Sequence, residues 1–183
     1  MSSWVQTCPD CGYVAQVIEE QPANPDAVRA AMAGDRWREL TAGDAMPRLA
    51  ALFLWHALLE RAQGRPLEAG EATIRAAWAA DDAMDGLLAE TCRRAASDIL
   101  LPLLESPDLE PDRRETLAVR LVDVLRRARE WERATQLCTD LLARTPEGVI
   151  GEVLRLQATL LERRDASCQR IPPASLGGPQ GWR

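Results

Sequence analysis

The sequence contains no lysine, a single histidine and few aromatic residues. Its 183 residues include six Trp but only one Phe and one Tyr, and all 22 basic residues are Arg. Against 28 acidic residues this gives a formal net charge of −6. Because phosphate binding needs clustered positive charge on the protein surface, the composition argues against a nucleic-acid partner.

Long apolar runs and export signals are also missing. No run approaches the ~18 residues that a membrane-spanning helix needs. The first residues, MSSWVQTCPDCGY, lack the basic and apolar regions of a secretory signal. The five cysteines are an odd number for a disulfide framework. These absences favour a cytoplasmic protein with no membrane partner, in which the cysteines stay reduced.

The common catalytic motifs do not occur either. There is no H-E-x-x-H helix, no Walker loop, no G-x-S-x-G elbow and no dinucleotide fingerprint. With His56 as the one histidine, acid–base chemistry would fall to carboxylates, which are scattered along the chain. The Glu90–Arg94 spacing and the Arg126-Arg127 cluster are typical of solvated helix faces. We therefore predict that the protein is not an enzyme and has no catalytic residues.

Composition divides the chain into four zones. Residues 1–18 form a short cysteine-containing head, and residues 19–47 form a connector with one or two short helices, because Pro and Gly recur there. Residues 48–164 are dense in Ala, Leu, Arg and Glu, which are strong helix formers. In residues 165–183 the sequence turns to Pro, Gly and Ser, which predicts a disordered tail.

Helix-breaking residues divide the third zone into six predicted helices. We expect them over residues 48–62, 67–80, 84–104, 112–128, 131–144 and 149–164. The third should end or kink at Pro102. The links are only a few residues long, so neighbouring helices should pack antiparallel as hairpins. The predicted fold class is all-α.

The segment 115–148 fits a tetratricopeptide repeat, a unit of about 34 residues that forms two antiparallel helices. The inner face of its first helix would be formed by Leu121, Val122 and Leu125. Ala134 would let the two helices approach closely. A weaker match around Ala69 lies close to, but not at, two repeat lengths upstream. We predict a tetratricopeptide-like stack of hairpins, with an irregular helical bundle as the alternative.

The sharpest local motif is the run from Cys8 to Gly12, Cys-Pro-Asp-Cys-Gly. Its C-P-x-C-G pattern is that of a zinc knuckle, in which two thiolates separated by two residues face one metal. Gly12 allows the positive-φ turn after the second ligand, and backbone N–H groups can then point at the sulfurs. Zn²⁺ is the expected metal, with Cys8 and Cys11 as ligands. A structural site takes four ligands, however, and the sequence has no second C-x-x-C.

Three interpretations of Cys8 and Cys11 stay open. The pair holds Zn²⁺ incompletely or with ligands from another chain, as in a homodimer joined through the head. Alternatively it is a vestigial knuckle that binds nothing, or a redox motif, although the βαβ scaffold of such motifs is missing. The remaining candidate ligands are isolated in the sequence and are expected in helix packing or in the tail. They are Cys92, Cys138, Cys168 and His56.

The chain resembles an uncharacterised bacterial family, the domain of unknown function 2225. Trp4-Val5 and the segment 8–15 are similar to the family's W-V-C-P-x-C-G-Y-A-A block, and residues 75–78 to its R-x-A-W segment. Residues 121–134 resemble a later L-x-x-x-L-x-R-R-x-x-x-x-E-A stretch, with Arg133 where Glu is usual. The resemblance covers most of residues 4–164 and implies metal binding and a helical-repeat fold without a known reaction.

Members of that family usually carry an earlier C-x-x-C. The resemblance therefore implies either that the head is half of a zinc ribbon or that the natural start lies upstream of Met1. Taken with the helical repeats, it leads us to expect a non-enzymatic interaction scaffold of tetratricopeptide type that binds a protein or peptide. The alternative is a zinc-binding module whose C-x-x-C head dimerises or recognises a partner.

Overall fold

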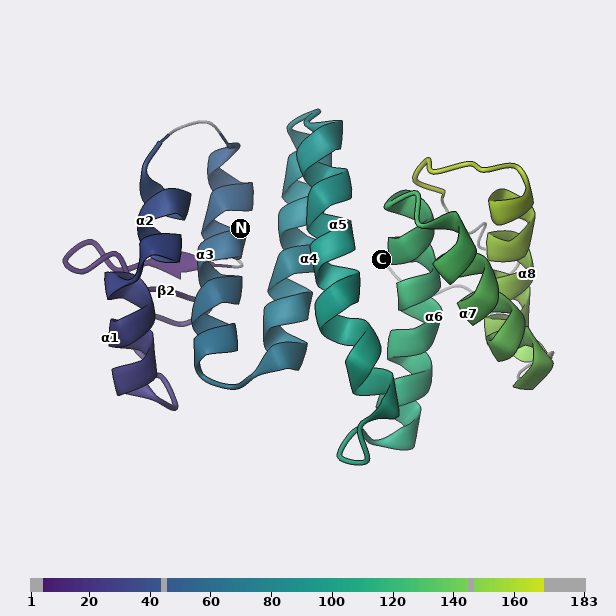
Figure 1. Ribbon diagram of the computed structural model, residues 1–183, viewed down its shortest axis with the longest axis horizontal. Helices are drawn as coiled ribbons and strands as arrows, with labels where there is room; N and C mark the ends of the chain where they lie inside the picture. Colours follow the sequence, from purple (N-terminus) through teal and green to yellow (C-terminus); the bar gives the residue numbers. More distant parts are fainter. Residues whose placement is uncertain (1–4, 44–45, 145–146, 170–183) are drawn as a thin grey trace, which may run out of the picture. The chain divides into compact units, whose positions relative to one another are not determined.

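The computed structural model describes residues 5–43, 46–144 and 147–169 (Figure 1). The chain divides after Leu103 into two compact units. Helices make up most of both units, and a single two-stranded sheet accompanies them in the described ranges. The predicted all-α class is confirmed. Among these residues, no helix is both long enough and apolar enough to cross a membrane.

Unit 1 begins with a short antiparallel β-hairpin. β1 (Gln6–Thr7) pairs with β2 (Val14–Ala15), with Gln6 opposite Ala15 and Thr7 opposite Val14. Val14 is fully buried, which ties the hairpin to the core of this unit. The sequence does not predict these strands, because two residues are too few for an alternation of polar and apolar side chains to show.

Two short helices occupy the connector, as predicted. α1 (Pro25–Ala33) begins at Asn24, whose side-chain oxygen accepts a hydrogen bond of 3.0 Å from the N–H of Ala27. Pro25 suits the first helical position, where its missing N–H has no partner to lose. Gly34 ends α1, and α2 (Asp35–Thr41) follows directly. The two helices lie against α3 (Arg48–Ala62).

Three longer helices form the body of unit 1. α3 is followed by α4 (Pro66–Asp82) and α5 (Gly86–Leu100), and links of only three residues join them side by side (Figure 1). α3 has the bounds that the sequence predicts. α5 is shorter than predicted, because Asp85 caps its start and the chain passes into a 3₁₀ helix (Leu101–Glu105) around Pro102.

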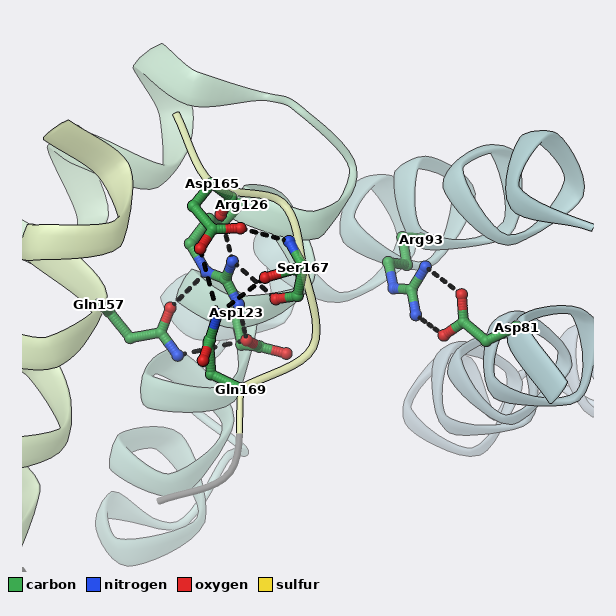
Figure 2. Close-up of polar contacts among 8 residues, drawn as sticks. All are labelled: Asp81, Arg93, Asp123, Arg126, Gln157, Asp165, Ser167 and Gln169. Atoms are coloured by element: carbon green, nitrogen blue, oxygen red, sulfur yellow. Dashed lines mark hydrogen bonds and ion pairs between the residues drawn. The ribbon is translucent and has the colours of Figure 1, made fainter. Parts of the chain in front are cut away.

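Small residues let α4 and α5 approach closely. Five alanines on α4 are at most 1% exposed, and a Cβ added to Gly70 would lie 2.3 Å from Cδ2 of Leu100 on α5. Arg93 on α5 is also buried, and its guanidinium pairs with the carboxylate of Asp81 on α4 (Figure 2). A buried guanidinium is tolerated because its N–H groups are bonded.

Unit 2 contains α6 (Pro111–Arg127), α7 (Trp131–Arg144) and α8 (Gly148–Glu162), and each contacts the other two. The residues predicted to line the inside of the first helix are fully buried: Leu121, Val122 and Leu125. Ala134 on α7 is fully buried as well, at the position where a small residue is expected. These three helices match the predicted bounds to within two residues at each end.

Candidate functional site

Cys8 and Cys11 lie in the turn that joins β1 to β2. The N–H of Cys8 donates a hydrogen bond of 2.8 Å to the carbonyl of Tyr13, and its carbonyl accepts one of 2.9 Å from the N–H of Gly12. Gly12 has a φ of +75°, so the predicted positive-φ turn after Cys11 is confirmed. Because the two strands close the turn, both thiols belong to one short loop.

The backbone of the loop affects the titration of the Cys8 thiol. Hydrogen bonds from the backbone of Cys11 and then of Asp10 lower the pKa of the Cys8 thiol, and the side chain of Cys11 adds to this effect. A lowered pKa favours the thiolate, which is the form that binds metals and attacks electrophiles. Cys8 is partly buried and Cys11 is exposed, so a ligand can reach both.

Two thiols supply half of a structural zinc site. Within the described ranges, no group of three or more His, Cys, Asp and Glu side chains is placed to hold a metal ion. Cys92 and Cys138 are buried in helix packing, as predicted, and burial raises the pKa of Cys92 to about 11. The thiol of Cys138 donates to the carbonyl of Leu154 at 3.4 Å. Cys168 is exposed beyond the end of α8.

A groove opens between α6 and α8 in unit 2. It has a volume of about 390 Å³. Its lining residues are Thr116, Val119, Arg120 and Asp123 of α6, Ile150, Val153, Leu156 and Gln157 of α8, and Gln169. The sequence does not predict this groove, because helical periodicity shows that α8 has an apolar face but not which part of that face stays uncovered.

Arg126 of α6 bonds to two of the residues that line this groove (Figure 2). Its Nε donates a hydrogen bond of 2.7 Å to Oε1 of Gln157, and its Nη2 donates one of 2.7 Å to Oδ1 of Asp123. Nη1 donates to the backbone carbonyls of Asp165 and Ser167. Thus one side chain fixes two residues of the groove wall and the segment that follows α8.

The predicted solvated face is wrong for Arg126, which has no exposed surface. The position lies on the buried side of α6, and the cost of burying the charge is offset by the hydrogen bonds that all three guanidinium nitrogens donate. Two of these bonds go to the carbonyls of Asp165 and Ser167, in the segment that the sequence assigns to the disordered tail. Residues 170–183 of that predicted tail lie outside the described residues.

Comparisons of the chain with protein-family models, with curated proteins and with solved structures give no match. The groove and the cysteine loop are therefore the features that bear on function.

Proposed function

We propose that the chain is a non-enzymatic interaction scaffold of tetratricopeptide type, and that the α6–α8 groove binds a segment of a partner protein. The groove is the observation that carries this proposal. Stacked helical hairpins present a concave face for binding, lined by equivalent helices of successive hairpins. α6 and α8, which flank α7 in the chain, correspond to such helices when residues 115–148 are taken as one repeat.

The chemistry of the groove supports a peptide ligand. Four apolar side chains, those of Val119, Ile150, Val153 and Leu156, can bury apolar side chains of a partner. Gln157 and Asp123 supply polar groups beside them, and Nε2 of Gln157 donates to Oδ1 of Asp123 at 3.2 Å. Because Arg126 holds both residues in place, little side-chain freedom is lost when a ligand binds.

The test is a peptide selection against the full chain, followed by calorimetry with two neighbouring variants. Ile150 lines the groove, whereas Val149 is 44% exposed and does not line it. Ile150→Asp should weaken binding of a selected peptide by about tenfold or more, and Val149→Asp should leave it nearly unchanged. Equal effects of the two substitutions, or no selected peptide, would count against the proposal.

A second function is favoured by the cysteine loop, namely zinc binding between two copies of the chain. The N–H groups directed at Cys8 and the turn at Gly12 suit a thiolate ligand pair. Two heads together would provide the four thiolates of a Cys₄ site. Purified protein should then contain one zinc per two chains and should dissociate on chelation or in the Cys8→Ser/Cys11→Ser variant. A tightly held zinc in a strictly monomeric chain, or no zinc at all, would contradict this function.

The relationship to the domain of unknown function 2225 and a cytoplasmic location belong to the same proposal. The family relationship is supported by the cysteine block, which forms a closed loop as a zinc knuckle requires, followed by helices. The cytoplasmic location is supported by the five free cysteines, which suit a reducing compartment. An interaction scaffold needs no catalytic residues, and the sequence contains none of the common catalytic motifs.

A further inference from the structure

A second cavity lies in unit 1, where the β-hairpin and the residues after it face α3 and α4. Its volume is about 270 Å³. The charged residues that line it are Glu20, Glu60, Glu68, Glu71, Arg65 and Arg75. Tyr13, from the C-P-x-C-G-Y block, and His56 also line it. The cavity is therefore polar and separate from the groove, and although Tyr13 of the β1–β2 turn lines it, neither cysteine of that turn does.

Two buried polar residues of α3 face this cavity. His56 is 5% exposed and Glu60 is 7% exposed, and Nε2 of His56 lies 3.7 Å from Oε1 of Glu60. Nδ1 of His56 has no hydrogen-bond partner among the described residues. Oε2 of Glu60 lies 3.2 Å from Nη1 of Arg65, but that ion pair lacks hydrogen-bond geometry. A buried polar atom is unfavourable without a partner, so Nδ1 of His56 marks a place that a ligand can complete. Oε2 of Glu60 can accept a hydrogen bond there in addition to its ion pair with Arg65.

The charge of the lining determines which ligand fits. Four carboxylates face two guanidinium groups, which leaves an excess of two negative charges. Arg65 already bridges Glu60 and Glu68, at 3.2 Å and 3.3 Å. Burial lowers the pKa of His56, so its imidazole is neutral near pH 7 and adds no positive charge. A cation is therefore favoured over an anion in this cavity.

We propose that this cavity binds a small organic amine in its protonated form. The carboxylate of Glu60 is the ionic partner of the ammonium group, and His56 is a hydrogen-bond acceptor beside it. Tyr13 also lines the cavity, and an aromatic ring attracts a cation through its face. The same chemistry would fit a free amine or the side chain of a lysine, and the chain itself has no lysine to occupy the site.

Isothermal titration of the full chain at low salt tests the proposal with three probes. They are 1,4-diaminobutane, N-acetyl-lysine amide, and succinate as an anion of similar length. We expect saturable binding of the diamine and no binding of succinate. If the lysine derivative binds at least as tightly as the diamine, the source is a peptide side chain; if only the diamine binds, the source is a free amine. Saturation by succinate, or by none of the probes at millimolar concentration, would overturn the proposal.

Matched variants assign the binding to the cavity. Glu60→Gln removes the charge with little change of shape and should weaken diamine binding by about tenfold. Glu90→Gln, on α5 and outside the cavity, should leave the affinity unchanged. Because Glu60 is buried, Glu71→Gln at a partly buried position of the lining provides a second test and should weaken binding several-fold. Unchanged affinity in both cavity variants, with wild-type circular dichroism, would also overturn the proposal.

Discussion

Nε of Arg126 donates a hydrogen bond of 2.7 Å to Oε1 of Gln157, and a fully buried guanidinium thereby joins α6 to α8. The same side chain forms an ion pair of 2.7 Å with Asp123 and bonds to two backbone carbonyls after α8. Its partners among the described residues all lie within unit 2. The stability of this unit should therefore depend strongly on this one arginine.

Replacing Arg126 by methionine tests this dependence. Arg126→Met keeps an unbranched apolar stem but leaves Asp123, Gln157 and two carbonyls without their donor. We expect the free energy of unfolding to fall by about 2–4 kcal/mol, because the buried partners of Arg126 lose their hydrogen bonds. The loss is smaller at Asp123, since its carboxylate is partly exposed and can bind water instead. Urea denaturation followed by circular dichroism measures the change. Arg113→Met, at an exposed position of the same helix, is the control and should cost much less.

The stability of unit 1 should depend on pH through His56. Burial lowers its pKa from 6.5 and the charges of Arg75 and Arg65 add to this shift, whereas the nearby backbone of Val14 opposes it. The unfolded chain therefore takes up a proton at this site at a higher pH than the folded chain does. The stability that this difference provides is present above pH 6.5 and is lost as the pH falls below it.

The measurement compares melting temperatures of the wild type and His56→Gln between pH 7.5 and pH 5. The wild type should lose stability relative to the variant as the pH falls. Burial raises the pKa of the neighbouring Glu60, so the contribution of Glu60 to stability changes with pH in the opposite direction. Because Glu60 is present in both proteins, this contribution largely cancels when their melting temperatures are compared. A difference that stays constant with pH would show that His56 titrates alike in the folded and unfolded chain.

The five thiols should differ in reactivity. Backbone hydrogen bonds lower the pKa of Cys8, whereas burial raises the pKa of Cys92 to about 11 and also raises that of Cys138. Iodoacetamide near pH 7 should therefore modify Cys8 first, and Cys92 and Cys138 only after unfolding. Mass spectrometry of digested samples over time gives the order, with urea-unfolded protein as the reference. Equal rates of modification at Cys8 and Cys92 in the folded protein would contradict the predicted order.

Replacing Met84 by glycine should stabilise the protein. Met84 follows α4 with a φ of 62° and is 90% exposed, so its side chain gives little packing in return for a left-handed backbone. Met84→Gly should raise the free energy of unfolding by up to about 1 kcal/mol. Gly64 occupies the same kind of turn after α3, with a φ of +75°, and Gly64→Ala should lower it by a similar amount. Thermal unfolding of the two variants should shift in opposite directions.

The positions of helices follow from local signals, and these are what the sequence contains. The bounds of α3 agree with the prediction because Pro47 and Gly64 flank it. The predicted start of α5 is two residues early, since the side chain of Asp85 caps the helix by accepting a hydrogen bond of 3.0 Å from the N–H of Leu88. The loop of Cys8 and Cys11 also follows from a local pattern, the glycine after the second cysteine.

Contacts between distant residues explain what could not be predicted. Arg126 is 31 residues from Gln157 and 39 residues from Asp165, and no periodicity relates these positions. The cavity around Glu60 is hidden for a related reason. α3 carries apolar residues on all its sides, so its pattern does not show which side would enclose a histidine and a glutamate. Both the Arg126 contacts and the cavity around Glu60 arise only from the packing of the helices, so the sequence pattern does not show them.

Gly70 on α4 and Leu100 on α5 are far apart in the sequence, but they pack against each other in the fold. Since a single added Cβ would overlap the leucine, the combined volume at positions 70 and 100 is fixed. In related proteins a larger residue at one of these positions should appear together with a smaller residue at the other. The pair would thus leave a signature of correlated substitutions, by which relatives with the same α4–α5 packing can be recognised even where the rest of the sequence has diverged.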